Sequence, residues 1–272
     1  MSPYTLIIPL YKGDQAAWVR EALCSMMNQT YEPDETIVVI DGPVSPELMA
    51  AVDEYSEPLR IKKLCLSQNV GLGLALAAAV SSASNEIVVR MDADDVALRD
   101  RCEKQIGFID NHPDIAVLGT QVAEFDTDPG LTYGLRRVPE TPEAIQRLLP
   151  WRNPMNHMTV AFRKAAVLNV GGYHDFRLVQ DYELWGRLMS RGYRFANLPE
   201  ILVLARAGKK MFDRRGGLQY WREEIMLFER LVSYGVVDRF RAIASLGIRG
   251  LARMTPRVFR NVFYRHIRVR TS

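Results

Sequence analysis

The first 111 residues of this 272-residue chain alternate short apolar segments with stretches of helical periodicity. This alternation is typical of a mainly parallel sheet with helices on both faces, because strands that are buried on both faces are apolar along their whole length. We therefore predict a mixed, mainly parallel α/β fold of the Rossmann-like type. Strands are expected at 4–9, 35–40, 60–66 and 86–91, and helices after the first strand and near 46–55, 71–82 and 98–111.

The pattern loosens after about residue 123. Residues 126–130 (DTDPG) are typical of the turn of a hairpin. Further strands are expected at 158–162 and 201–205, and further helices at 181–191, 217–235 and, in two parts broken at Pro256, 240–267.

Cysteine usage and hydropathy exclude several classes of protein. Cys24, Cys65 and Cys102 are widely spaced and form no CxxC pair, which argues against a disulfide framework or a zinc site and favours a reduced compartment. The N-terminal apolar stretch is short and has no basic leader, and the longest apolar run, 70–80, is too short to span a bilayer. We therefore expect a cytoplasmic protein.

The formal net charge of +3 is unevenly distributed, with nine arginines and no acidic residue from Arg239 to the C-terminus. Apolar residues are interleaved with these arginines, as in a basic amphipathic helix that lies on an anionic membrane. A helix that packs on the body of the protein with a solvated basic face explains the same pattern, and both interpretations stay open. The tail has no recognisable nucleic-acid-binding module, so we expect no nucleic-acid partner.

Polar and turn residues follow the ends of the predicted strands. Asp41-Gly42 follows the second strand, Asn69-Val70-Gly71 the third, and Asp92-Ala93-Asp94-Asp95 the fourth. The ligand crevice of such a sheet lies at the carboxyl ends of its strands. These residues therefore predict a nucleotide site at that rim.

The three carboxylates in residues 92–95 repel one another, and a divalent cation with oxygen ligands, Mn²⁺ or Mg²⁺, would offset that repulsion. The alternative is that Asp94 or Asp95 caps a helix that follows directly. We assign Asp95 to capping or to support of the other two carboxylates. Arg90 is expected to pair with the cluster.

Five segments occur in an order that resembles the inverting family 2 glycosyltransferases with a GT-A fold: IIPLYKGD, VVIDG, NVG, RMDADD and GGYHDFRLVQDYELW. The match covers about residues 5–206, and LYKGD, DGP and RRGG are similar to segments of bacterial exopolysaccharide transferases of the amylovoran and capsule type. The resemblance implies a GT-A domain at 1–216, with a nucleotide half at about 1–122 and an acceptor half at about 123–216. A basic, helical extension follows at 217–272.

The resemblance also implies roles at the donor site. Pro9 and Tyr11 would line the base pocket, Asp41 would hydrogen-bond the base or ribose, Asn69 and Gly71 would lie beneath the nucleotide, Asp92 would face the ribose or sugar, and Asp94 would contact the metal. The alternative for Asp41 is a turn role before Gly42, and the alternative for Asn69 and Gly71 is a cap and helix start.

An inverting transfer needs a base that removes a proton from the acceptor hydroxyl. Asp181, which lies 87 residues after Asp94 at the predicted start of a helix, aligns with the family's catalytic acidic residue, although Gln180 replaces the usual preceding Glu. Without the resemblance, Asp181 equally fits a helix N-cap. Glu183 is interpreted as helix surface.

Three residues are candidates for contacts with the acceptor or the phosphates. His157 stands where family members often have His, although a lone His is more often a satisfied structural group. A basic loop follows the last predicted strand and consists of Arg206, Lys209, Lys210, Arg214 and Arg215. Arg214 and Arg215 are its better candidates for a diphosphate contact upon closure of a loop.

The expected function is metal-dependent, inverting transfer of a sugar from a nucleotide-diphosphate sugar, above all a UDP-sugar, to a glycan or lipid-linked acceptor in exopolysaccharide, capsule or O-antigen synthesis. One alternative is an NAD-dependent oxidoreductase, suggested by Gly71-x-Gly73 but lacking the third glycine. Another is a nucleotidyltransferase, which needs a Gly-rich phosphate loop after the first strand. A third is a non-enzymatic subunit that binds nucleotide sugars.

Overall fold

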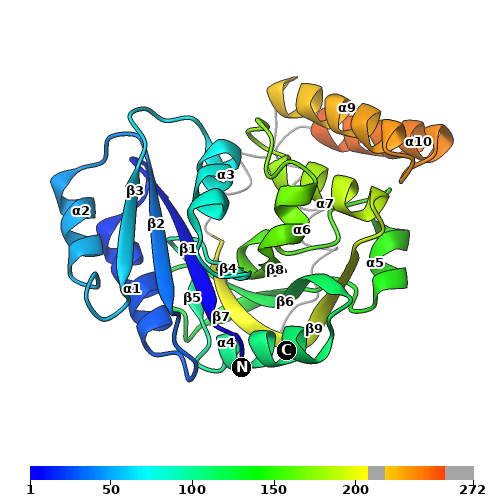
Figure 1. Cartoon of the computed structure of the whole chain (residues 1–272). Coiled ribbons are helices and arrows are strands. Elements are labelled where there is room, and N and C mark those ends of the chain that lie inside the picture. The colour runs from blue at the N-terminus through cyan, green and yellow to red at the C-terminus, as the bar shows by residue number, and fades with distance from the viewer. Residues whose placement is uncertain (208–217, 255–272) are drawn as a thin grey trace.

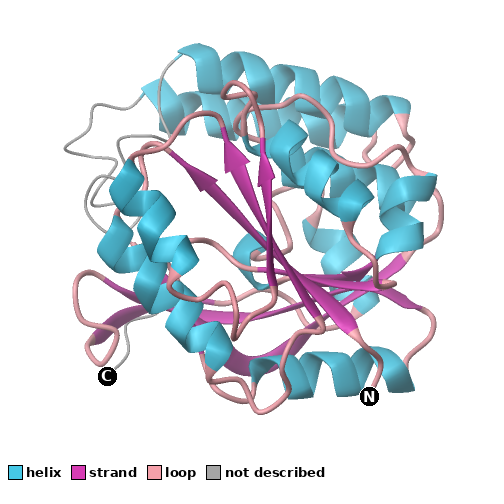
Figure 2. Cartoon of the chain, turned by 60° about the vertical axis from the view of Figure 1, so that its left-hand side comes forward, coloured by secondary structure: helices cyan, strands magenta, loops and turns pink. Residues whose placement is uncertain are grey.

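The computed structural model describes residues 1–207 and 218–254. At its centre lies a nine-stranded sheet. Eight of its strands follow the order β3-β2-β1-β4-β8-β6-β9-β5, and the ninth, β7, pairs with β6. Helices cover both faces of this sheet (Figures 1 and 2). The predicted α/β fold with a mixed sheet is confirmed.

The N-terminal part of the chain forms the parallel half of the sheet. β1 (Tyr4–Tyr11) lies between β2 (Glu35–Asp41) and β4 (Ile87–Arg90), and β3 (Ile61–Cys65) lies beyond β2. The intervening helices are α1 (Ala16–Met27), α2 (Pro46–Asp53) and α3 (Leu72–Ser82). The four predicted strands are confirmed, and β2 is buried along its whole length between the helices that cover the two faces of the sheet.

The second half of the sheet is mixed. β8 (Ala161–Arg163) runs antiparallel to both β4 and β6 (Ile115–Phe125), β9 (Arg194–Arg206) is parallel to β6, and β5 (Val96–Ala97) is antiparallel to β9. The predicted hairpin turn joins β6 to β7 (Thr132–Arg136). The helices of this half are α4 (Arg101–Asn111), α5 (Pro142–Leu148), α6 (Lys164–Asn169) and α7 (Gln180–Ser190).

Two predictions in this half are wrong in extent. Residues 158–162 are not one strand, because a 3₁₀ turn, η1 (His157–Thr159), precedes β8 and is closed by a 2.9 Å hydrogen bond from the Thr159 N–H to the Asn156 carbonyl. The strand expected at 201–205 is the end of the 13-residue β9, whose first residues pair with β6 from Ile115 onward.

Two apolar cores lie on opposite faces of the sheet. Along β1, Leu6, Ile8 and Leu10 face the core that includes α1, α2 and α4, whereas Ile7 faces the core that includes α3 and α7. This alternation follows from the two-residue period of a strand. α3 and α7 contact each other and cover the same face of the sheet.

The described part of the C-terminal extension consists of α9 (Leu218–Ser233) and α10 (Arg239–Met254), which lie beside α7 (Figure 1). Leu227, Phe228 and Leu231 of α9 are buried in the same core as Trp185 of α7. The extension therefore packs on the body through α9. The predicted break at Pro256 lies outside the described residues. Within those residues, no helix combines the length and the apolar character that crossing a bilayer requires.

Candidate active site

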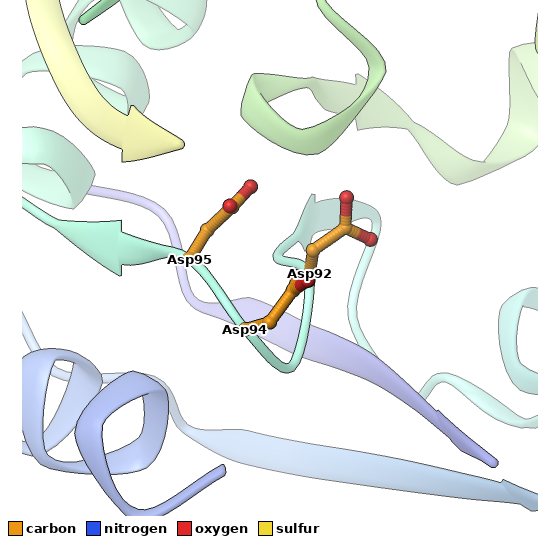
Figure 3. A group of neighbouring side chains, drawn as sticks. All are labelled: Asp92, Asp94 and Asp95. Atoms are coloured by element: carbon orange, nitrogen blue, oxygen red, sulfur yellow. The ribbon is translucent and has the colours of Figure 1, made fainter. Parts of the chain in front are cut away.

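Three aspartates share the loop that joins β4 to β5. One carboxylate oxygen from each of Asp92, Asp94 and Asp95 lies within 4.8 Å of the other two. Figure 3 shows the three side chains around a single turn of this loop. Pairing of β4 with β1 places the loop at the rim of the parallel half, so the three negative charges gather where the sequence pattern predicts them.

Asp95 is buried and does not cap a helix. It leads into β5, and α4, the helix predicted at 98–111, begins only at Arg101, so the capping interpretation of Asp95 is wrong. Asp95 Oδ1 accepts the Arg206 N–H at 2.8 Å, whereas Oδ2 has no hydrogen-bond partner among the described residues. Burial, and next the charges of Asp92 and Asp94, raise the pKa of Asp95 well above its ordinary value.

These features fit a divalent cation. A buried carboxylate oxygen that lacks a partner, beside two further carboxylates, is unfavourable unless a positive charge faces it. Donor sets made of oxygen suit Mg²⁺ and Mn²⁺. Asp95 thus joins Asp92 and Asp94 as a candidate ligand, a role that the sequence argument missed because a carboxylate after a strand also suits a cap.

Arg206 holds the acidic loop in place and is not part of an open basic loop. Its Nε donates to the Asp94 carbonyl at 3.0 Å, and its Nη2 pairs with Glu21. The guanidinium also lies over the rings of Trp18 and Phe125, 4.9 and 4.5 Å from their centroids. Because these contacts occupy the guanidinium, Arg206 is no candidate for the diphosphate.

Arg90 lies beneath the acidic loop at the end of β4. The predicted pairing is present, because Arg90 Nη2 forms an ion pair with Asp92. Arg90 is only 2% exposed, and its Nε and Nη1 have no hydrogen-bond partner within residues 1–207 and 218–254. The ion pair engages one Asp92 oxygen, and the role of Asp92 towards the sugar or ribose stays a prediction.

Asp41 ends β2 and fixes the turn before α3. Its Oδ1 accepts the Val70 N–H at 2.7 Å, and its Oδ2 accepts the Gly71 N–H at 3.0 Å and Asn69 Nδ2 at 2.9 Å. Gly42 permits this close approach, since a Cβ there would lie 2.5 Å from the Asn69 nitrogen. The turn role of Asp41 is therefore present, and a contact with the nucleotide stays a prediction for the same rim.

Tyr11 lies beside Asp41, because the two residues are partners in the register of β1 and β2. The Tyr11 side chain is exposed, and its backbone N–H donates to Asp14 Oδ2 at 2.8 Å. Pro9 stands two residues earlier on the same face of β1. An exposed aromatic ring next to the Asp41 turn suits a residue that lines a base pocket, and this role stays a prediction.

Asp181 lies in the first turn of α7, and the N-cap position belongs to Val179, so the N-cap interpretation of Asp181 is wrong. Asn153 Nδ2 donates to Asp181 Oδ2 at 2.6 Å. Burial is the largest influence and raises the pKa of Asp181, while the Tyr182 N–H, Asn153 and the charge of Arg90 act in the opposite direction. Sequence reasoning missed Asn153, because no motif surrounds it.

His157 is buried at the start of η1. Its Nε2 lies 2.9 Å from the Tyr173 hydroxyl, and its ring meets the Trp185 ring edge-on. Burial and then the charge of Arg90 lower the pKa of His157 well below its ordinary value, so the ring is neutral at pH 7. These contacts give His157 a structural role, and its contact with the acceptor or phosphates stays a prediction.

Glu183 is fully buried, so its assignment to the helix surface is wrong. Glu183 Oε2 accepts Arg187 Nη2 at 2.7 Å, and Oε1 accepts the Tyr234 hydroxyl at 2.6 Å. Arg187 also donates to the Gly172 carbonyl at 2.8 Å. The pair Glu183–Arg187 therefore joins α7 to the end of α9 and to the turn before α7. The periodicity of α7 alone does not reveal these contacts between segments.

Charges from the acidic loop and from the start of α7 both act on Tyr173. Burial raises the pKa of Tyr173, Arg90 lowers it, and the charges of Asp181 and Asp92 raise it further. Both carboxylates therefore lie within electrostatic reach of one hydroxyl. Arg214 and Arg215 lie outside the described residues, so the structure does not relate them to this site.

The sequence from residue 5 to residue 172 matches the model of glycosyl transferase family 2. The chain belongs to this family. The match ends before Asp181, and it covers the rim with Asp41 and the acidic loop. Membership in a glycosyltransferase family sets aside the oxidoreductase and nucleotidyltransferase alternatives.

Two relatives align with this family 2 glycosyltransferase over nearly their whole length. The amylovoran biosynthesis glycosyltransferase AmsE of Erwinia amylovora is 35% identical over 253 residues, which are 93% of this chain and 94% of that protein. The UDP-Gal:alpha-D-GlcNAc-diphosphoundecaprenol beta-1,3-galactosyltransferase of Escherichia coli is 31% identical over 264 residues, 97% of this chain and 96% of that protein. The resemblance to transferases of the amylovoran type is thus confirmed.

A solved structure shows the same fold. The mannosyltransferase PcManGT from Pyrobaculum calidifontis, in complex with GDP-Man and Mn²⁺, has a TM-score of 0.62 and 18% sequence identity, over 98% of this chain and 79% of that chain. The GT-A fold of this family 2 glycosyltransferase is confirmed. Membership in this family makes the protein a glycosyltransferase.

Proposed function

We propose that this family 2 glycosyltransferase moves a sugar, with inversion, from a nucleoside-diphosphate sugar to a hydroxyl group of a lipid-linked glycan. The observation that carries the proposal is the cluster of three carboxylates in the 92–95 loop at the rim of the parallel strands, with Asp181 as a second, separate carboxylate set whose charge acts, like that of Asp92, on Tyr173. Inverting transfer needs charge compensation for the departing diphosphate on one side of the anomeric carbon and a base on the other. The two carboxylate sets meet these two needs.

Asp181 is the proposed base. Its carboxylate takes the proton of the acceptor hydroxyl as the hydroxyl oxygen bonds to the anomeric carbon and the bond from that carbon to the diphosphate oxygen breaks. Because burial raises the pKa of Asp181, the carboxylate is a stronger base than an exposed Asp. The hydrogen bond from Asn153 fixes its orientation.

Asp94 is proposed to hold a divalent ion, Mn²⁺ or Mg²⁺, with Asp92 and Asp95 beside it. Such an ion, when bound, offsets the charge that develops on the diphosphate. PcManGT supports the combination of this fold with Mn²⁺ and a sugar nucleotide. Asp92, oriented by Arg90, would face the sugar or ribose.

The donor we favour is a UDP-sugar, because the relative from Escherichia coli is named for UDP-Gal. The proposed nucleotide contacts are Pro9, Tyr11, Asp41, Asn69, Gly71 and Asp92. The lipid-linked acceptor is supported by the same relative, whose name specifies a diphosphoundecaprenol group. A role in exopolysaccharide, capsule or O-antigen synthesis is supported by AmsE.

The proposal includes a cytoplasmic location, peripheral on the inner face of the membrane. It also includes contacts of His157, Arg214 and Arg215 with the acceptor or the phosphates. The division of the chain into a GT-A domain at 1–216 and a basic extension at 217–272 is part of the same proposal.

The test is a transfer assay with Mn²⁺, labelled UDP-Gal, UDP-Glc and UDP-GlcNAc in turn, and GlcNAc-diphosphoundecaprenol as acceptor. We expect transfer from one of these α-linked donors and a β-linked product, identified by NMR of the anomeric proton. An α-linked product would contradict inversion. Stabilisation of the protein by UDP-sugars without transfer of any would favour the alternative of a non-enzymatic binding subunit.

A further inference from the structure

The outer face of α10 carries an exposed apolar stripe. Phe240, Ile243 and Ile248 are 82%, 71% and 61% exposed. At 100° per residue these three side chains lie on one side of the helix. Ala242 and Ser245, on the opposite side, are buried against the body. The helix is therefore packed through one face, and its other, apolar face is exposed within residues 1–207 and 218–254.

Arginines flank this stripe. Arg239 and Arg241 precede and follow Phe240, so they fall on either side of it around the helix, and both are exposed. Arg241 pairs with Asp238 at 3.2 Å, and Asp238 is the last acidic residue of the chain. The outer face is thus apolar along its centre and basic at its borders.

The inner face of α10 contacts the segments around the proposed base. Arg249 Nη2 donates to the Trp151 carbonyl at 2.9 Å, and the guanidinium lies over the Tyr182 ring, 5.7 Å from its centroid. Tyr182 directly follows Asp181, and Trp151 lies two residues before Asn153, which bonds to Asp181. α10 therefore lies between the solvent on its outer face and the segments that hold Asp181 on its inner face.

The neighbouring helix α9 braces the same region. Glu223 Oε2 accepts the Leu178 N–H at 2.8 Å, just before α7 begins, and the buried Glu224 accepts Arg249 Nη1 at 2.6 Å. α10 is thus fixed to the body through α9 as well as directly. A surface that contacts the outer face of α10 therefore lies at a fixed distance from Asp181.

We propose that the outer face of α10, formed by Phe240, Ile243 and Ile248 with Arg239 and Arg241, docks on an anionic lipid surface. An apolar centre bordered by arginines matches acyl chains bordered by negatively charged headgroups. One helix diameter, roughly 10 Å, then separates the lipid from the segments that carry Asp181. The purpose of this docking rests on the proposed function: a lipid-linked acceptor would approach Asp181 from the α10 side.

Two other occupants fit this face less well. A second copy of the chain would bring the arginines of two identical faces together, which is unfavourable. Nucleic acid offers phosphates to the arginines and nothing apolar to the exposed Phe240 and Ile243. An anionic lipid surface satisfies both parts of the face.

The experiment is flotation of the full chain with vesicles of phosphatidylcholine alone or mixed with phosphatidylglycerol. The wild type is expected to float with the anionic vesicles, and the triple variant Phe240→Ser, Ile243→Ser, Ile248→Ser to bind them at least about tenfold more weakly. The double variant Arg239→Gln, Arg241→Gln should also lose about tenfold. Leu131→Ser is the matched control, because Leu131 is 72% exposed on the turn before β7.

Failure of the wild type to float with anionic vesicles would overturn the proposal. Undiminished flotation of the triple variant would also overturn it and would assign lipid binding to other residues. Unchanged melting temperatures show that the variants fold, as expected for exposed positions. The assay needs no donor, metal or transfer, so its failure is distinguishable from failure of the proposed function.

Discussion

The two carboxylate sets of the site differ in what stabilises their negative charge. On the donor side, Asp95 has a buried oxygen without a partner among the described residues, next to the carboxylates of Asp92 and Asp94. On the acceptor side, the single carboxylate of Asp181 is stabilised by the Asn153 amide, the Tyr182 N–H and the charge of Arg90. The proposed cation would supply the missing partner on the donor side, whereas protein groups stabilise the carboxylate on the acceptor side.

This difference predicts how substrate binding and transfer respond to changes on each side of the site. The donor side should depend on metal and nucleotide, because its remaining partner comes from solution. The acceptor side should depend on the packing of the C-terminal helices, because Glu223 and Arg249 hold the segments that carry Asp181 and Asn153. Variants of Asp181, Arg249 and Asn153 separate these two dependences.

Asp181→Asn should reduce kcat by roughly 10²- to 10⁴-fold, the usual contribution of a general base. Binding of UDP with Mn²⁺ should be unchanged, because the variant leaves the acidic loop intact. Steady-state kinetics and calorimetry measure the two quantities. Unchanged turnover would remove Asp181 from the chemistry, and parallel loss of UDP binding would show that the two sides are not separable.

Arg249→Met should lower the free energy of unfolding by about 3 kcal/mol, because it removes the guanidinium that faces the buried Glu224 carboxylate. Loss of the contact with the Trp151 carbonyl should also slow transfer while leaving UDP binding unchanged. Denaturant titration and kinetics measure both effects.

The matched control is Arg241→Met on the same helix. Its ion pair with Asp238 is exposed, so the change in unfolding free energy should be below about 1 kcal/mol. Equal destabilisation by the two variants would show that α10 does not support the acceptor side through Arg249.

Asn153→Ala should reduce kcat about tenfold, as expected for loss of one hydrogen bond to a charged group. The Asn153 N–H favours the ionised carboxylate and so lowers the pKa of Asp181. Its removal raises that pKa, and the acid limb of the kcat/KM profile should move to higher pH. Asn169→Ala, an exposed amide on α6, should move neither quantity. An acid limb that stays in place would separate Asn153 from the base.

Much of the donor side was predictable because its residues follow strand ends. Continuous apolar segments identified β1, β2 and β4, and the rules for parallel sheets then placed Asp41 and Asp92 at one rim. Even on this side, predicting the role of Asp95 required knowing whether a strand or a helix follows it in the chain. The two-residue strand β5 carries too little periodicity to distinguish it from the start of a helix.

The acceptor side was predictable only in part. The helix around Asp181 was found, but neither Asn153 nor the burial of Glu183 was, because both depend on segments that meet only in the folded chain. Glu183 accepts a hydrogen bond from Tyr234, 51 residues away, and the periodicity of α7 does not report which helix packs against it. Tertiary packing here overrides the local signal for an exposed charge.

The central claim is that a divalent cation bound by the acidic loop anchors the donor opposite Asp181. Titration of Mn²⁺ in the presence of UDP, followed by electron paramagnetic resonance, tests it most directly. The account predicts that Asp94→Asn weakens Mn²⁺ binding at least about tenfold, whereas Asp181→Asn and the surface control Asp128→Asn bind Mn²⁺ as the wild type does. Wild-type Mn²⁺ affinity in Asp94→Asn would contradict it.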